Sequence, residues 1–253
     1  MTPIISLITI TYNSAKTLRH TIDSIRNQTY REMEYIIVDG GSTDGTLDVI
    51  EENNDLVTKW VSEPDGGIYD AINKGIAMAS GEYVGLLHAD DMLADNGVLK
   101  AIYHAIDQHR PDALYGDLDY ISAGDNARLI RRWISSPFHP IMLKRGWMPP
   151  HPTLYVKREW FNRIGTYNNQ MKIAADYDFI LRLFSKPNLE TIYLPQCLVK
   201  MRVGGASNRS IKNIIIKMKE DYQAIKNNHI GGLATLLVKN FSKVGQFFNK
   251  KQQ

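Results

Sequence analysis

Two adjacent carboxylates, Asp90 and Asp91, stand at the end of the segment GLLHADD, directly after an apolar run. Neighbouring carboxylates repel each other, and each is costly to remove from water. A divalent cation would balance their charge, and Mg²⁺ takes oxygen ligands from one or two carboxylates together with substrate phosphates. The alternative is a solvated turn without a ligand. The pair makes a metal site the first hypothesis for this sequence.

Polar side chains also end the other short apolar runs in the first part of the chain. They are Thr11, Tyr12 and Asn13 after IISLITI, Asp39 after EYIIV, Glu63 and Asp65 after TKWVS, and His88, Asp90 and Asp91 after EYVGLL. Ligands of open parallel sheets bind beyond the carboxyl ends of the strands. Each residue alone has a structural explanation as a turn or a helix cap, but four such ends together favour a shared binding edge. An acidic edge suits a nucleoside diphosphate carried with Mg²⁺ or Mn²⁺.

The elements that would position these residues alternate between two periodicities. Strand-like runs lie at 4–10, 34–40, 58–63 and 82–88, and the segments between them, at 14–29, 42–54 and 68–81, have helical character. This order predicts an α/β fold with a mainly parallel sheet, right-handed crossovers and flanking helices. A further helix is predicted over 96–109 and ends before Pro111.

The pattern changes after residue 110. Two β-rich runs, 112–122 and 127–134, flank the turn-forming tetrapeptide AGDN and predict a hairpin. A proline-rich loop follows. The later predicted elements are a strand beginning at 153, a helix over 174–186, a strand over 190–203, and helices over 211–228 and 233–251.

The gross composition narrows the classes of function. The 253 residues carry a net charge of +3, which is too small to argue for nucleic-acid binding. A single cysteine, Cys197, allows no internal disulfide and favours a reducing compartment. The first residues lack the pattern of a signal peptide, and no run reaches the roughly 20 apolar residues that span a bilayer. We therefore expect a cytoplasmic protein.

The charge is unevenly distributed along the chain. Residues 206–253 hold nine Lys and Arg against two Asp and Glu, so the preceding part is mildly acidic. In the last predicted helix the apolar set is Leu233, Leu236, Leu237, Phe241, Val244, Phe247 and Phe248, and the charges are Lys239, Lys243, Lys250 and Lys251. A basic amphipathic helix of this kind can lie in a membrane interface, which predicts peripheral membrane contact through 231–253. The alternative is that the apolar stripe packs on the rest of the chain or on a second copy.

Three segments together resemble the glycosyltransferases of family 2, which have the GT-A fold. They are ISLITITYNSAKTLRHTIDSIRNQTYREMEYIIVDGGSTDGT, SEPDGGIYDAINKGIAMASGEYVGLLHADD and IAADYDFILRL. The resemblance covers about residues 4–205. It implies a nucleotide-sugar-binding half over 1–110 and an acceptor-binding half of the same domain over 111–205, followed by the basic helical extension 206–253.

The resemblance implies roles for the residues of the acidic edge. Asp39 matches the carboxylate that reads the nucleoside base, and Asp65 matches a second nucleotide contact. Asp90 and Asp91 match the end of the family's D-x-D-D metal motif, and either could be the inner ligand of Mn²⁺ or Mg²⁺. The first acidic position of that motif is His88 here, a candidate for a ribose or acceptor contact. The other implied nucleotide-binding candidates are Thr11, Tyr12, Asn13, Lys74 and Asp90.

The implied reaction moves a sugar from a nucleoside-diphosphate donor, with a UDP-sugar favoured, to a hydroxyl of a saccharide or lipid-linked saccharide. Asp176 in AADYDF resembles the family's general base, which takes the proton of the acceptor hydroxyl. Attack opposite the leaving group implies inversion. Asp178 stands two positions further on and points to another face of the helix. The resemblance suggests a place in bacterial cell-surface polysaccharide or glycolipid biosynthesis.

Further candidates lie in the second half of the chain. His151, in MPPHPTLY, resembles the family's segment before the acceptor site. RVGGASNRS resembles a closing segment, in which Arg202 and Arg209 could reach the diphosphate. Aromatic residues in this half could face sugar rings or build the core. They are Trp147, Tyr155 and Tyr167.

Other functions fit less well. A sugar-phosphate nucleotidyltransferase needs a glycine-rich, arginine-containing loop after the first strand, where this chain has TYNSAKT. An aspartyl-phosphate phosphatase needs an aspartate nucleophile at the same place, and none is present. A non-catalytic homologue that binds sugar or nucleotide would not need the full set of Asp39, Asp90, Asp91 and Asp176.

Overall fold

The computed structural model describes residues 4–124, 127–203 and 211–245, with side chains given to residue 240 except that of residue 211. The first part of the chain alternates strands and helices. Its elements are β1 (Ile5–Thr11), α1 (Ala15–Arg26), β2 (Met33–Asp39), α2 (Thr46–Glu51), β3 (Lys59–Ser62), α3 (Ile68–Met78) and β4 (Tyr83–Leu86). These four strands pair in parallel in the order β3-β2-β1-β4, which confirms the prediction from the alternating pattern.

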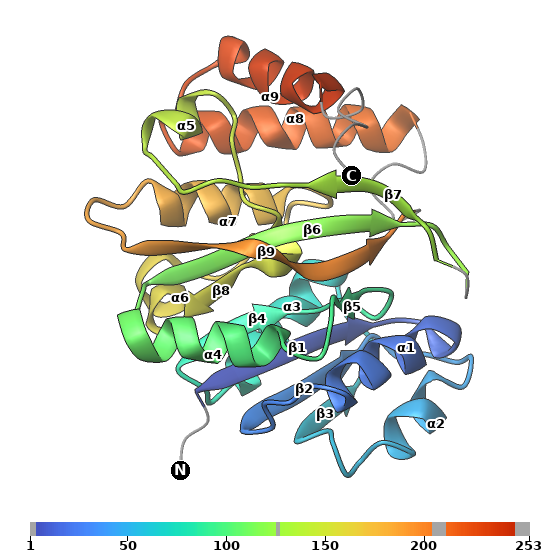
Figure 1. The fold of residues 1–253 in the computed structure, drawn as a ribbon. Coiled ribbons are helices and arrows are strands. Elements are labelled where there is room, and N and C mark those ends of the chain that lie inside the picture. Colours follow the sequence, from blue (N-terminus) through green and yellow to red (C-terminus); the bar gives the residue numbers. More distant parts are fainter. Residues whose placement is uncertain (1–3, 125–126, 204–210, 246–253) are drawn as a thin grey trace.

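The second part of the chain extends the same sheet with mixed pairing (Figure 1). Its elements are β5 (Met92–Leu93), α4 (Val98–His109), β6 (Ala113–Ile121), β7 (Leu129–Trp133), α5 (Ile141–Lys144), η1 (His151–Thr153), β8 (Tyr155–Lys157), α6 (Glu159–Ile164), α7 (Ala175–Phe184), β9 (Thr191–Arg202), α8 (Ile211–Asn227) and α9 (Leu233–Gly245). The predicted hairpin is confirmed as the antiparallel pair β6–β7. The short strand β8 lies antiparallel to both β4 and β6, while β6 and β9 are parallel.

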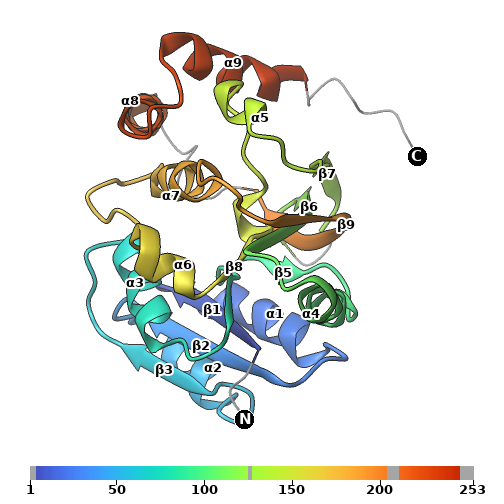
Figure 2. The ribbon, with the colours of Figure 1, turned by 90° about the vertical axis from the view of Figure 1, so that its left-hand side faces the viewer.

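Helices cover both faces of the sheet (Figure 2). On one face, α1, α2 and α4 bury apolar residues against β1 and β2, and Leu18, Ile22 and Ile25 of α1 show the helical spacing seen in the sequence. On the other face, α3, α6 and α7 pack over Ile8, Ile36 and Val84. The carboxyl ends of the parallel strands stay open between these layers, which leaves their loops available for a ligand.

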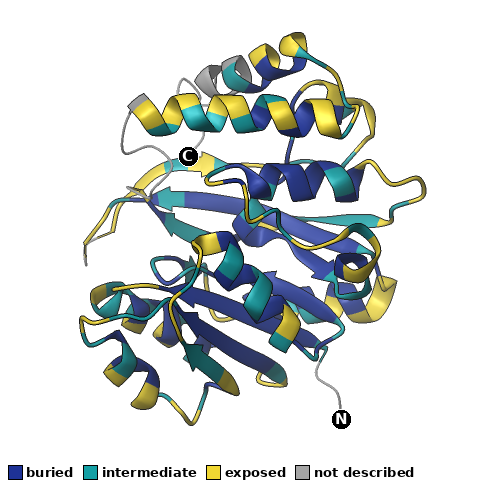
Figure 3. Ribbon diagram, turned by 180° about the vertical axis from the view of Figure 1, so that it is seen from behind, coloured by how far each residue is buried: buried dark blue, intermediate teal, exposed yellow. Residues whose placement is uncertain are grey.

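The last two helices form an additional layer over α7. Figure 3 shows α7 largely buried, with α8 and α9 outside it and exposed along their outer sides. Asp221 of α8 is buried between Lys217 at 3.0 Å and Lys239 of α9 at 2.6 Å. Burial alone would raise the pKa of Asp221, but the two ammonium groups hold it below its usual range. The buried charge is therefore paired, as a stable interior requires.

The structure contradicts the prediction that Lys239 is a charge on the outer, polar side of the final helix. Its side chain is 1% exposed, and its ammonium group lies 3.0 Å from the centroid of the Tyr177 ring. The backbone of Gly146, with φ of +72°, comes so close to α9 that an added Cβ would lie 2.4 Å from Cβ of Lys239. Leu236 is buried beside it, whereas Leu233 and Leu237 are exposed. The described part of the apolar stripe thus packs partly on the domain.

None of the helices in the described ranges is both long enough and apolar enough to cross a bilayer.

Candidate functional site

The loops after β1 and β2 are tied together by the side chains predicted to bind nucleotide. Asp39 is fully buried, and its Oδ2 accepts hydrogen bonds from the backbone N–H of Gly41 at 3.0 Å and of Ser42 at 2.8 Å. The same oxygen accepts a hydrogen bond from Oγ of Ser62 at 2.7 Å. Asn13 donates its backbone N–H to Oγ of Ser42 at 2.7 Å. Asp39 therefore holds the loop in shape before any ligand arrives.

Tyr12 and Asp65 meet at the rim of this loop pair. Tyr12 is 64% exposed although it is a large aromatic residue. A Cβ at Gly40 would lie 2.7 Å from Oδ2 of Asp65 and 3.4 Å from the Tyr12 ring, so a larger residue here would displace the carboxylate of Asp65. An exposed ring beside a carboxylate offers stacking and hydrogen-bond acceptance, the two contacts that a nucleoside base can use.

Thr11 and Lys74, two further nucleotide-binding candidates, differ in their surroundings. The hydroxyl of Thr11 is buried at the end of β1 and has no hydrogen-bond partner. Lys74 of α3 forms ion pairs with two carboxylates that are close to it in the sequence. Its ammonium lies 2.9 Å from Oε1 of Glu63 and 3.5 Å from Oδ2 of Asp70. The hydrogen bond to Glu63 is the main cause of the raised pKa of Lys74. Lys74 thus balances acidic neighbours and is not paired with Asp90 or Asp91.

Asp91 is a buried carboxylate without a hydrogen bond. Its side chain is 1% exposed, and neither carboxylate oxygen has a partner at ordinary hydrogen-bond geometry. Burial, and then the neighbouring charge of Asp90, raise the pKa of Asp91 well above its ordinary value. Arg202 at the end of β9 opposes this in part, and its own Nε is also buried without a partner. Buried polar groups are normally satisfied, so these two side chains are candidates for contact with a ligand.

Three predicted site residues from distant parts of the chain come together next to this pair. Nδ1 of His151 lies 3.2 Å from Oδ2 of Asp176. Burial, and secondly the proximity of His151, lower the pKa of His88 to about 4, while Asp90 and Asp176 act in the opposite direction. His88 is therefore neutral at pH 7. The topology brings the acidic motif after β4, the turn η1 and the start of α7 to one site.

Asp176 and Asp178 have different surroundings, as their helical spacing predicts. Asp178 is buried and accepts hydrogen bonds from Nε of Arg182 at 2.9 Å and from Nδ2 of Asn228 at 3.1 Å. Asp176 keeps a side chain that is 19% exposed, with His151 as its neighbour. The geometry therefore gives Asp178 a structural function and leaves the carboxylate of Asp176 available to a substrate.

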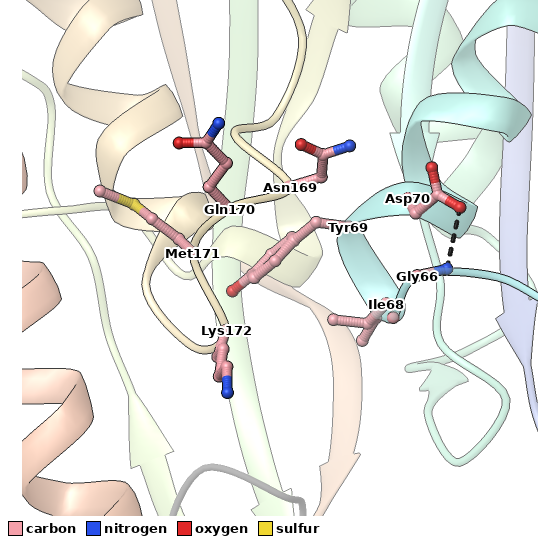
Figure 4. A pocket seen from close by; sticks show the side chains of 9 residues that line it. Gly66, Ile68, Tyr69, Asp70, Asn169, Gln170, Met171 and Lys172 are labelled. Atoms are coloured by element: carbon pink, nitrogen blue, oxygen red, sulfur yellow. Dashed lines mark hydrogen bonds between the residues drawn. The ribbon is translucent and has the colours of Figure 1, made fainter.

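A pocket of about 280 Å³ opens beside the start of α7 (Figure 4). Figure 4 shows the ring of Tyr69 extending from α3 toward the loop before α7. The hydroxyl of Tyr69 faces the backbone amides of Ala175 and Asp176. Tyr69 thus links the pocket to the predicted base. The lining residues are Gly66, Gly67, Ile68, Tyr69, Asp70, Asn169, Gln170, Met171 and Lys172.

The sequence did not single out Tyr69 or Tyr120, both of which border the site. Tyr120 of β6 lies within electrostatic range of Asp91 and Asp176, under the guanidinium of Arg131 at 4.2 Å. Its position near the end of a predicted strand was the available signal, but many core tyrosines share it.

Conversely, three predicted aromatic candidates belong to the core. Trp147 packs on Phe138 and Phe184, Tyr155 packs on Gly85, and Tyr167 stacks on Phe179.

The residues at this edge fit a hard divalent cation. Within the described ranges, no three His, Cys, Asp or Glu side chains are arranged to hold a metal ion by themselves. Asp90 and Asp91 nevertheless supply carboxylate oxygens, and those of Asp91 accept no hydrogen bond of ordinary geometry from the described residues. Mg²⁺ is commonly held by one or two carboxylates and completes its shell with water and phosphate oxygens. Arg209, the other arginine of the predicted closing segment, lies outside the described residues.

Comparison with known proteins gives a family match over most of the chain. The model of the family described as Glycosyl transferase family 2 matches residues 6–182. A PGL/p-HBAD biosynthesis glycosyltransferase of Mycobacterium bovis is 34% identical over 221 residues, covering 85% of this chain and 83% of that protein. The chondroitin synthase of Pasteurella multocida is 26% identical over 228 residues, which are 89% of this chain but 23% of the synthase.

Solved structures show the same fold. S. aureus TarS 1–349 in complex with UDP-GlcNAc superposes with a TM-score of 0.70 at 21% identity, over 98% of this chain and 76% of that one. The mannosyltransferase PcManGT of Pyrobaculum calidifontis, in complex with GDP-Man and Mn²⁺, gives a TM-score of 0.62 at 18% identity, over 100% and 77% of the two chains. The predicted GT-A fold is confirmed by these likenesses.

Proposed function

Because this chain belongs to glycosyl transferase family 2, we propose that it transfers a sugar from a nucleoside-diphosphate sugar to a hydroxyl acceptor with inversion. The observation that carries the proposal is the meeting of the Asp176–His151 pair with His88, Asp90 and Asp91 at one edge of the sheet. A carboxylate that can take a proton thereby lies beside residues suited to a diphosphate and its cation.

The donor binds across the loops after β1, β2 and β3. Tyr12 supplies an aromatic face and Asp65 a carboxylate beside it, and Asp39 holds the intervening loop in the shape that receives the base. UDP-sugars are the favoured donors because TarS, which shares the fold, binds UDP-GlcNAc. PcManGT binds GDP-Man, so guanosine donors belong in the same screen.

Asp90 and Asp91 hold Mn²⁺ or Mg²⁺ in this proposal, with the diphosphate oxygens as further ligands. When bound, the cation stabilises the charge that develops on the leaving diphosphate. Arg202 faces the same place with an unpartnered Nε and adds a second positive group. His88, neutral at pH 7, can donate or accept a hydrogen bond to the sugar or the ribose.

Asp176 takes the proton of the acceptor hydroxyl. The acceptor oxygen forms a bond to the anomeric carbon of the donor sugar as the bond from that carbon to the diphosphate oxygen breaks. The nucleoside diphosphate leaves on the opposite face, so the configuration inverts and no covalent sugar–enzyme intermediate forms. His151 lies 3.2 Å from the carboxylate and orients it. The pocket beside Tyr69 borders the base and offers room for part of the acceptor.

The acceptor is a saccharide or a lipid-linked saccharide, and the product serves bacterial cell-surface polysaccharide or glycolipid biosynthesis. The supporting observation is the kinship with a relative named for PGL/p-HBAD biosynthesis and with a chondroitin synthase.

A panel of UDP-, GDP- and dTDP-sugars, tested with Mn²⁺ and with a chelator, checks the proposed function. We expect one donor to be hydrolysed slowly alone and consumed faster with the right acceptor, and the product to have the inverted configuration. Nucleotide binding without hydrolysis of any donor would favour a binding homologue. Retention of configuration would remove Asp176 as a general base.

Replacing Asp39 with Asn should weaken binding of the nucleoside diphosphate by roughly tenfold, the equivalent of about 1.4 kcal/mol. One acceptor oxygen would become a donor that faces the loop amides. Calorimetric titration with UDP and GDP measures the loss. Ser62→Ala is the matched control, because it removes one bond to Asp39 but leaves the carboxylate. Equal affinity of the Asp39→Asn variant and the wild type would exclude Asp39 from nucleotide recognition.

Peripheral membrane contact through the C-terminal helices is proposed from the exposed apolar residues of α9. Leu233, Leu237 and Val238 of α9 are exposed. Full-length protein should sediment with phosphatidylglycerol vesicles at low salt and less at high salt, and Leu237→Ser with Val238→Ser should abolish this. Deleting α9 is a poor test, because it would strip Lys239 from Asp221. Protein that stays in the supernatant would contradict membrane contact. The exposed side chains of α9 would then be candidates for self-association.

A further inference from the structure

One carboxylate of α8 holds the loop that leads into α7. Glu220 accepts a hydrogen bond from the backbone N–H of Lys172 at 2.8 Å through Oε1. Through Oε2 it accepts from the backbone N–H of Ile173 and of Ala174, each at 2.9 Å. Three consecutive amides of one loop therefore point at a single side chain that is 46 or more residues away in the sequence.

These three amides lie directly before the catalytic turn of the proposed mechanism. Ala174 precedes α7, and its carbonyl accepts the first helical hydrogen bond, from the N–H of Asp178 at 3.0 Å. Asp176 lies in that first turn. Lys172 also lines the pocket, opposite the start of α3. The position of the loop thus sets both where Asp176 lies and how wide the pocket is.

The bonds to Glu220 are more specific than ordinary helix packing. Hydrogen bonds to a charged acceptor are shorter and stronger than neutral ones. A negative charge before a helix N-terminus is also favourable. Directly after α8, Asn228 donates a hydrogen bond to Asp178 at 3.1 Å, so α8 and the residue that follows it hold the chain on both sides of Asp176.

We infer that Glu220 is a positioning residue for Asp176: it holds the loop 172–174 so that the carboxylate of Asp176 stays beside His151 and the acceptor pocket. The inference rests on the proposed function for the catalytic part only. Residue 220 lies outside the segment 6–182 that matches the family model. The C-terminal extension, 206–253, therefore helps to position a residue of the proposed active site.

Amide hydrogen exchange and steady-state kinetics on full-length Glu220→Ala and Glu220→Gln test the inference. We expect faster exchange at residues 172–174 in the Ala variant, with an intermediate rate in the Gln variant, which keeps one acceptor oxygen. We also expect kcat for transfer to fall by roughly 10- to 100-fold in the Ala variant, the scale of a small misplacement of a reacting group. The KM for the donor should stay within about twofold, since the donor contacts lie elsewhere. Lys219→Ala, an exposed neighbour on the same helix, is the matched control.

Unchanged exchange at 172–174 in both variants would overturn the inference, as would faster exchange with an unaltered kcat. A fall in kcat accompanied by an equal loss of donor binding and a general rise in exchange would show a structural role only. A wild-type protein that transfers no sugar from any donor would refute the proposed function instead, and the exchange rates would still decide whether Glu220 holds the loop.

Discussion

Asp176→Asn should lower the rate of sugar transfer by about 10²- to 10⁴-fold, the usual contribution of a general base. The amide has the same shape and can keep a contact with His151, but it cannot take the proton of the acceptor hydroxyl. Donor binding should survive, because the proposed donor contacts lie on the loops after β1, β2 and β3 and do not include Asp176. Transfer assays under saturating donor, combined with calorimetric donor binding, measure the two effects separately.

Asp178→Asn is the informative companion to this variant. Asp178 is buried and paired with Arg182 and Asn228, so its substitution should lower the melting temperature more than Asp176→Asn does. A kcat near the wild-type value in Asp176→Asn would move the base elsewhere. A large loss of kcat in Asp178→Asn without a loss of stability would make that residue the better candidate.

Asp91→Asn should make the protein more stable at pH 7 without a divalent cation, yet end its response to Mn²⁺. Burial, followed by the charge of Asp90, raises the pKa of Asp91. Protonated Asp91 makes its whole contribution to the free energy of unfolding below the ordinary Asp pKa of about 4. That contribution is lost as the pH rises through the raised pKa of the folded state. An uncharged amide avoids that loss, because it has no charged form to desolvate.

Thermal unfolding between pH 4 and 8, with a chelator and with Mn²⁺, tests this prediction. The wild type should lose stability as pH rises and regain it with Mn²⁺, because a ligand of the native state stabilises it. The Asn variant should melt several degrees higher in the chelator, show little change with Mn²⁺, and lose divalent-dependent turnover. Asp107→Asn, at an exposed position on α4, is the control. An equal Mn²⁺ response in both proteins would contradict the metal assignment.

The parallel part of the sheet was predictable because its information is local. Each strand and helix of residues 4–88 carries its own periodicity, and the rule that ligands bind beyond parallel strands then places Asp39, Asp65 and Asp91 at one edge. The mixed pairing around β8 was not predictable in this way. It depends on which strand a short segment reaches after a long irregular connection, and spacing along the chain does not encode that.

The residues that hold the site in position from outside it were the least predictable part of the structure. Glu220 looks like an exposed charge on an amphipathic helix, and Lys239 looks like a membrane-facing lysine. Their partners, the amides of 172–174 and the carboxylate of Asp221, are known only once α7, α8 and α9 are stacked. Charge pairing across three helices leaves no periodic signal in the sequence.

The buried pair of Asp221 and Lys239 has a consequence for synthesis on the ribosome. Segment 6–182, which contains the acidic edge and Asp176, is translated first, but Asp221 has only Lys217 as its partner until residue 239 has emerged. Removing one partner of a buried ion pair costs about 3–5 kcal/mol, a large share of the stability of a typical domain. A nascent chain interrupted before residue 239 would therefore keep α8 loose and present an unfolded segment to cellular proteases. Docking of α8 on the rest of the domain thus depends on a lysine that is translated after it.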